Sequence, residues 1–98
     1  MTSRTLNEVI QTLTEAGASL RCDDMRRYLE SLGFEVRDGR KQGHKVVTHR
    51  HIEGFFSTSY TCGHGKNPEI KPAYVRNISK TLQTHYQQLS DYLGEEQQ

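Results

Sequence analysis

Apolar residues recur every three or four positions in two stretches near the N-terminus of the chain. In residues 5–15 the apolar stripe consists of Leu6, Val9, Ile10 and Leu13. In residues 23–32 it consists of Met25, Tyr28, Leu29 and Leu32. This spacing is typical of amphipathic helices, and Thr5 and Glu8 are spaced as a capping box at the start of the first one. The pattern therefore predicts two helices, each with one buried face.

Short runs of alternating apolar and polar residues follow and indicate strands. Residues 34–37 form the first run, and Asp38-Gly39 after it is a turn signal. Residues 45–48 predict a second strand, and residues 55–62, rich in aromatic and β-branched side chains, predict a third. A glycine-rich loop over residues 63–68 ends this region. Tight loops between short strands favour an antiparallel meander.

A longer helical stripe follows Pro72, which suits the first turn of a helix. Its apolar members are Val75, Ile78, Leu82, Tyr86, Leu89 and Leu93. We expect one continuous helix that Gly94 ends, with residues 95–98 as a frayed tail. The predicted fold is α+β, in the order α-α-β-β-β-α, with helices packed on one face of a three-stranded antiparallel sheet. The second half of the last helix extends beyond this sheet, so it packs either on the first helix or on a second subunit.

The composition allows only a small hydrophobic core. The chain has 98 residues, of which 33 % are hydrophobic, or roughly 36 % when glycine is counted in place of tyrosine, against a typical 45–50 %. We therefore expect no wide pocket for an organic cofactor. No stretch approaches the roughly 20 apolar residues of a membrane helix, and no signal-peptide pattern is present, so a cytoplasmic protein is expected. Two cysteines do not make a disulfide scaffold, and both are expected to be reduced.

The charges are segregated along the chain, although the net charge is only +1. Residues 36–80 carry nine basic and three acidic side chains together with four of the five histidines, whereas residues 1–35 and 81–98 are acidic overall. A basic middle between acidic ends is typical of a surface that faces a polyanion. Ordinary mixed surface charge is the alternative.

His44 is the first candidate for chemistry because it stands at the start of a predicted strand, within the basic run Arg40-Lys41-Gln42-Gly43-His44-Lys45. An imidazole can give or take a proton near neutral pH. Neighbouring lysine and arginine side chains would hold a phosphodiester and stabilise the charge of its transition state. RNA carries its own nucleophile in the 2′-hydroxyl, so this pattern is compatible with RNA cleavage. A surface histidine in a hairpin is the alternative.

A zinc site is a second candidate. Alternate residues on a strand point the same way, so His49-x-His51 and Cys62-x-His64 could together supply four nitrogen and sulfur ligands. The gap of one residue within each pair is tighter than in standard zinc signatures. The alternative is that these are solvated histidines beside a buried thiol.

The loop Gly63-His64-Gly65-Lys66 is a third candidate, because glycines let backbone amides approach a phosphate near the start of a helix. A flexible connection between strand and helix is the alternative. Tyr60, Tyr74 and Tyr86 could stack on nucleic-acid bases. Aromatic residues of this kind also complete small cores.

Residues 23–82 resemble the HicA family of toxins, which are small ribonucleases with a fold like the double-stranded RNA-binding domain. The resemblance rests on Leu32-Gly33-Phe34 after a helix, on Gly43-His44 opening the second strand, and on Ile70-Lys71-Pro72 leading into a helix with Val75 and Ile78. Members of that family usually carry a serine or threonine between the glycine and the histidine, and this chain does not. We expect a single domain over residues 1–98, in which residues 1–20 add a helix to a HicA-like core of residues 21–83, and residues 84–98 extend the last helix.

The resemblance implies a toxin of a type II toxin–antitoxin system that cleaves mRNA without a metal ion or cofactor. His44 would be the catalytic general acid or base, and the RNA-binding residues would be Arg40, Lys41, Gly43, Lys45, Lys66 and Lys71. The implied partners are mRNA and a cognate HicB-like antitoxin, and a homodimer through the first or last helix is a further option. The alternatives are a non-catalytic RNA- or protein-binding module of the same fold, and a small zinc protein that uses His49, His51, Cys62 and His64.

Overall fold

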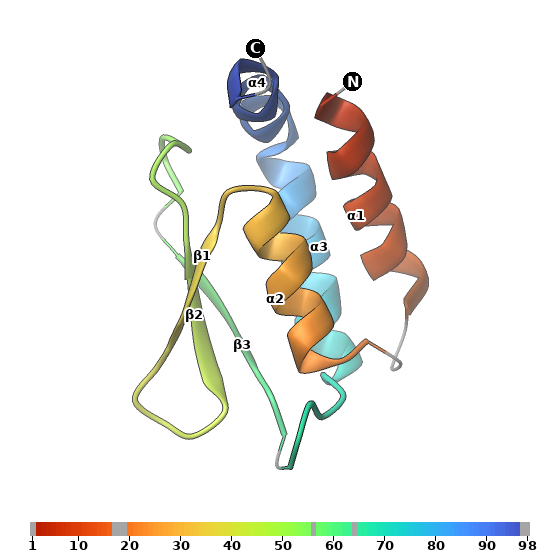
Figure 1. Cartoon of the computed structure of the whole chain (residues 1–98), viewed down its shortest axis with the longest axis vertical. Coiled ribbons are helices and arrows are strands. Elements are labelled where there is room, and N and C mark those ends of the chain that lie inside the picture. Colours follow the sequence, from red (N-terminus) through yellow and green to blue (C-terminus); the bar gives the residue numbers. More distant parts are fainter. Residues whose placement is uncertain (1, 17–19, 56, 64, 97–98) are drawn as a thin grey trace.

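A three-stranded antiparallel sheet and four helices make up the fold, which a computed structural model describes over residues 2–16, 20–55, 57–63 and 65–96. The strands are β1 (Glu35–Asp38), β2 (His44–Thr48) and β3 (Thr58–Thr61), paired in the order β1-β2-β3 (Figure 1). The helices are α1 (Thr2–Ala16), α2 (Cys22–Ser31), α3 (Pro72–Thr84) and α4 (Tyr86–Glu96). The predicted α+β class and the antiparallel order of the strands are confirmed.

The two faces of the sheet differ sharply in burial. Val36, Val47 and Tyr60 are buried on the face that α2 and α3 cover, with α2 packed on β1 and α3 on β3. Because side chains alternate along a strand, the residues between them point to the opposite face. There His44 pairs with Thr61 across β2 and β3, and Val46 pairs with Ser59. All four are only partly buried, so this outer face is open.

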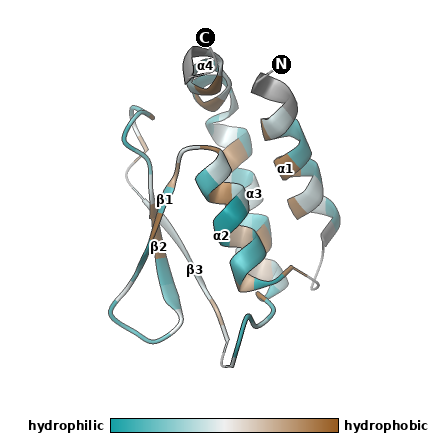
Figure 2. Cartoon of the chain, viewed as in Figure 1, coloured by the Kyte–Doolittle hydropathy of each residue, from teal (hydrophilic) through white to brown (hydrophobic). Residues whose placement is uncertain are grey.

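The N-terminal helix packs against other helices of the same chain. α1 lies beside α3 and α4 (Figure 1) and carries hydrophobic positions between hydrophilic ones (Figure 2). Its Leu6 and Leu13 are almost fully buried. Leu89 and Leu93 of α4 belong to the same hydrophobic cluster. α1 therefore covers the apolar stripe of the last helix that suggested a homodimer. The homodimer stays a prediction, and this stripe no longer supports it.

The last helical stripe forms two helices, so the prediction of one continuous helix is wrong. His85 leaves the helical conformation with φ −105° and ψ 23°, and α4 begins directly after it. The break turns α4 toward the loop after β2, where the Gln88 side chain donates a hydrogen bond of 2.8 Å to the Glu53 carbonyl. Neither proline nor glycine marks this break and the apolar stripe continues across it, so the sequence pattern contains no signal for it.

Three predicted boundaries also differ from the structure. α1 begins at Thr2, so Thr5 and Glu8 lie within the helix and do not form its capping box. α4 continues through Gly94 to Glu96, and residues 97–98 of the predicted tail lie outside the described residues. β3 begins only at Thr58, and Phe55 lies in the loop before it, where its ring packs edge-on against Phe34 at 5.6 Å.

Candidate active site

A tight turn at residues 39–43 places His44 at the edge of the open sheet face. The His44 amide donates to the Lys41 carbonyl at 3.0 Å, and the Gly39 amide donates to the His44 carbonyl at 2.7 Å. The imidazole lies directly against Gly39, where a Cβ atom would come within 2.2 Å of His44 Cδ2. Glycine at position 39 therefore makes room for the ring of the candidate catalytic histidine.

Gly43 has a structural role in the same turn. Its φ is +82°, in the left-handed region that favours glycine, and a Cβ atom would lie 2.3 Å from the Cys62 carbonyl oxygen. The Cys62 amide donates to the Gly43 carbonyl at 2.7 Å. The turn is thus held tightly against the end of β3, which leaves no space for a side chain at position 43.

His44 lines a pocket of about 560 Å³ on the open face. The other lining residues are Gly39, Arg40, Lys41, Val46, Ser59, Thr61 and Tyr74. Residues that carry one imidazole, two cationic groups and three hydroxyl groups thus line one cavity, a combination suited to a phosphodiester. Sequence analysis identified His44, Arg40 and Lys41, but not Ser59 or Thr61, because these two join the site only through the register of β2 and β3.

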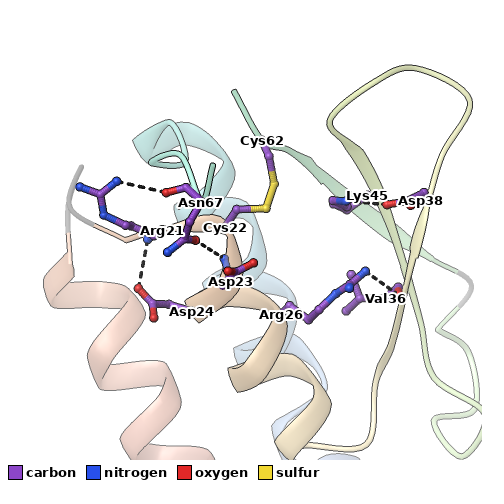
Figure 3. The surroundings of a disulfide bond; sticks show 10 residues. All are labelled: Arg21, Cys22, Asp23, Asp24, Arg26, Val36, Asp38, Lys45, Cys62 and Asn67. Carbon is purple, nitrogen blue, oxygen red and sulfur yellow. Dashed lines mark hydrogen bonds and ion pairs between the residues drawn. A yellow bond between two sulfur atoms is a disulfide. The ribbon is translucent and has the colours of Figure 1, made fainter. Parts of the chain in front are cut away.

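Lys45 does not share the His44 pocket. It is on the opposite face of β2, where its side chain is only 20 % exposed and its ammonium pairs with the Asp38 carboxylate (Figure 3). The hydrogen bond from Lys45, followed by the charge of its ammonium, holds the pKa of Asp38 below its ordinary value. Lys45 and Gly43 line a neighbouring pocket of about 430 Å³, and Gly39, Arg40 and Lys41 line both pockets.

The remaining predicted RNA-binding residues lie outside both pockets. Lys66 is exposed in the loop that leads to α3, and Lys71 is the exposed residue directly before that helix. Their part in RNA binding stays a prediction.

A disulfide joins Cys22 to Cys62, so the prediction that both cysteines are reduced is wrong. Their Cα atoms are 5.8 Å apart, and 40 positions separate them in the sequence. Backbone contacts bring the start of α2 to this place, since the Cys22 amide donates to the Pro68 carbonyl at 2.9 Å. The Asp23 amide likewise donates to Asn67 Oδ1 at 2.9 Å (Figure 3). Neither contact has a sequence signal.

The disulfide also changes the zinc hypothesis, because Cys62 has no thiolate to offer. His49 is buried and both of its ring nitrogens are engaged: Nε2 lies 3.0 Å from the Leu32 carbonyl oxygen, and the His51 amide donates to Nδ1 at 3.1 Å. His51 stacks on Tyr92 with ring centroids 5.0 Å apart, and His64 lies outside the described residues. Within the described ranges no three histidine, cysteine or acidic side chains gather as a metal site, and the four-ligand set does not assemble.

His49 instead helps to hold α4 against the sheet side of the molecule. Its ring meets those of Phe34 and Tyr92 edge-on, at centroid distances of 4.7 Å and 4.8 Å. Burial lowers the pKa of His49, opposed in part by the hydrogen bond to the Leu32 carbonyl. The Leu32 carbonyl oxygen can only accept, so Nε2 carries a hydrogen and donates it. Nδ1 accepts from the His51 amide and therefore carries no hydrogen. The His49 imidazole in this arrangement is neutral.

Comparison with known proteins leaves the family open. No family model, curated protein or solved structure matches this chain. Among the described residues, no helix is long and apolar enough to cross a membrane.

Proposed function

We propose that this protein is an endoribonuclease that cuts mRNA at the His44 pocket. The observation that carries the proposal is the convergence of His44, Arg40 and Lys41 on one open cavity with hydroxyl side chains around it. The resemblance to the HicA toxins points to the same histidine. Both lines of reasoning favour a phosphodiester as the group that the pocket holds.

The chemistry requires one proton to leave the 2′-hydroxyl and one to reach the departing 5′-oxygen. The 2′-oxygen bonds to the adjacent phosphorus, the bond from phosphorus to the 5′-oxygen breaks, and the products end in a 2′,3′-cyclic phosphate and a 5′-hydroxyl. His44 either accepts the proton from the 2′-hydroxyl or donates the proton to the 5′-oxygen, and the remaining one of these two transfers takes place with solvent. Arg40 and Lys41 stabilise the negative charge that develops on the phosphorane oxygens.

Thr61 can supply a hydroxyl where the family pattern would have one before the histidine. It pairs directly with His44 across the sheet and lines the same pocket. The missing serine or threonine before His44 is therefore compatible with the proposal, because β3 brings a residue with a hydroxyl group to the lining of the pocket.

The proposal extends to a type II toxin whose HicB-like antitoxin covers the pocket, and to a cytoplasmic location, where mRNA is found. Disulfides are rare in that compartment, and those that form there are usually transient or redox-sensing. We therefore expect cleavage by the reduced protein as well, and the assay is run with and without reductant.

The test is RNA cleavage in excess EDTA by the wild type, His44→Ala and His51→Ala. His51 is an exposed histidine outside the pocket and serves as the matched control. The wild type and His51→Ala should leave cyclic phosphate ends, and His44→Ala should cut about 10²–10⁴-fold more slowly, with circular dichroism showing all three folded. Equal cleavage by His44→Ala would refute the role of this histidine.

A second function is RNA binding without cleavage. It is favoured by the fact that, among the described residues that line the pocket, His44 is the one histidine and no carboxylate accompanies it, so these residues offer no second imidazole or carboxyl group as a general acid or base. A wild type that retards RNA and leaves it intact in prolonged incubation would establish this function. The binding should weaken steeply with salt, since phosphate contacts release counterions.

A further inference from the structure

Apart from His44 itself, Tyr74 is the one aromatic side chain among the described residues that line the His44 pocket. It sits in the first turn of α3, where its amide donates to the Lys71 carbonyl at 3.0 Å. Its ring is half-buried and packs against the hydrophobic core. The ring is therefore anchored on one side while it lines an open cavity on the other.

The other two tyrosines considered for base stacking are committed elsewhere. Tyr60 is fully buried under the helices. The Tyr86 hydroxyl donates to Asn7 Oδ1 at 2.7 Å, at the contact between α4 and α1. Of the three, only Tyr74 lies where it could meet a base next to His44.

The two cations of the pocket, Arg40 and Lys41, are exposed. Within the described part of the chain, neither Arg40 nor Lys41 forms an ion pair or a side-chain hydrogen bond. By contrast, Lys45 pairs with Asp38, and Arg50 pairs with Glu35 at 3.4 Å. Arg40 and Lys41 are thus available for an anionic ligand.

We propose that the His44 pocket binds one nucleotide of single-stranded RNA, with its base stacked on Tyr74 and its phosphate held by Arg40 and Lys41. This inference rests on the proposed action on RNA and names the form of RNA that is recognised. A cavity of about 560 Å³ lies within the range of about 300–1,000 Å³ found for single-ligand pockets. An aromatic platform and adjacent cations are the two parts from which single-strand sites are built.

The geometry selects against a duplex. In an A-form helix the base faces are covered by their neighbours, and proteins reach mainly the backbone and the 2′-hydroxyls of the shallow groove. Only an unpaired, splayed base can stack on Tyr74 inside a cavity. The 2′-hydroxyl and phosphate of that nucleotide would then lie at the side of the pocket that His44, Arg40 and Lys41 line.

The experiment measures binding and does not depend on cleavage. Fluorescence anisotropy follows a labelled 2′-O-methyl RNA octamer, which cannot be cut, and a 16-base-pair duplex of the same chemistry. The proteins are the wild type, Tyr74→Phe and Tyr74→Leu, with Tyr28→Leu as a control at a half-buried tyrosine that does not line the pocket. Thermal melts identify any loss of folding in the two leucine variants.

Stacking on one aromatic ring contributes about 1–3 kcal/mol, which corresponds to roughly 5- to 150-fold in affinity. Tyr74→Leu should therefore bind the octamer roughly 5- to 150-fold more weakly, while Tyr74→Phe and Tyr28→Leu stay within about 2-fold of the wild type. Inorganic polyphosphate should bind all four proteins equally, because it has no base.

Three results would overturn the inference while leaving RNA cleavage intact. The first is a Tyr74→Leu protein that binds the octamer as tightly as the wild type. The second is a Tyr74→Phe protein that is as weak as Tyr74→Leu, which would assign the effect to the hydroxyl. The third is a wild type that prefers the duplex. Failure of the wild type to bind either RNA would instead refute the proposed function and this inference with it.

Discussion

The Cys22–Cys62 disulfide is expected to contribute a large share of the stability of this small domain. A cross-link between residues 40 positions apart removes about 13 cal/mol/K of chain entropy from the unfolded state, or about 4 kcal/mol at 25 °C. Domains of this size are stable by only about 5–15 kcal/mol in total. Reduction should therefore lower the melting temperature by roughly 15–30 °C, taking about 4–8 °C per kcal/mol.

The assay is urea unfolding followed by circular dichroism, with and without dithiothreitol, on the wild type and on Cys22→Ala/Cys62→Ala. Alanine is chosen because both positions are buried, and serine would bury a hydroxyl. The reductant should destabilise the wild type by about 4 kcal/mol and leave the double variant unchanged. A loss below about 1 kcal/mol would refute the entropic reasoning and show that hydrogen bonds such as that from Cys22 to Pro68 hold this junction without the covalent link.

Three further predictions concern single positions. The Tyr60 hydroxyl is buried with no hydrogen-bond partner among the described residues, and burial raises its pKa to about 12. Tyr60→Phe should therefore leave the free energy of unfolding unchanged or raise it by about 1–2 kcal/mol. A lower free energy of unfolding in urea would reveal a partner of the hydroxyl. Burial lowers the pKa of His49, so the unfolded state binds a proton at this residue more readily than the folded state does. The free energy of unfolding should therefore have its full value above pH 6.5 and fall as the pH drops below 6.5. His49→Gln should reduce this fall in urea titrations between pH 5 and 8. Gly43→Ala should lower the free energy of unfolding by about 1–3 kcal/mol, and by more than Gly54→Ala does. Both glycines have positive φ, but only at position 43 would a Cβ atom meet a backbone atom, the Cys62 carbonyl oxygen. Equal losses of stability in thermal melts of the two variants would contradict the predicted clash.

The most instructive difference between sequence and structure is the position of Lys45. In the sequence it directly follows His44 and belongs to the same basic run. In the sheet the two side chains point to opposite faces, and Lys45 pairs with Asp38. Adjacent residues on a strand point to opposite faces of the sheet, because the side chains alternate. Thr61, 17 positions away, is closer to the candidate chemistry because it pairs with His44.

The sequence by itself determined the type and order of the elements up to α3, because helical and strand periodicities depend on residues only a few positions apart. It also identified His44, Arg40 and Lys41, which lie within five residues of one another. Tertiary structure alone decided the break at His85, the Cys22–Cys62 bond and the arrival of Thr61 and Tyr74 at the His44 pocket. These features depend on strand register and on packing between segments that are distant along the chain. A local pattern of apolar and polar residues does not encode which distant segments meet.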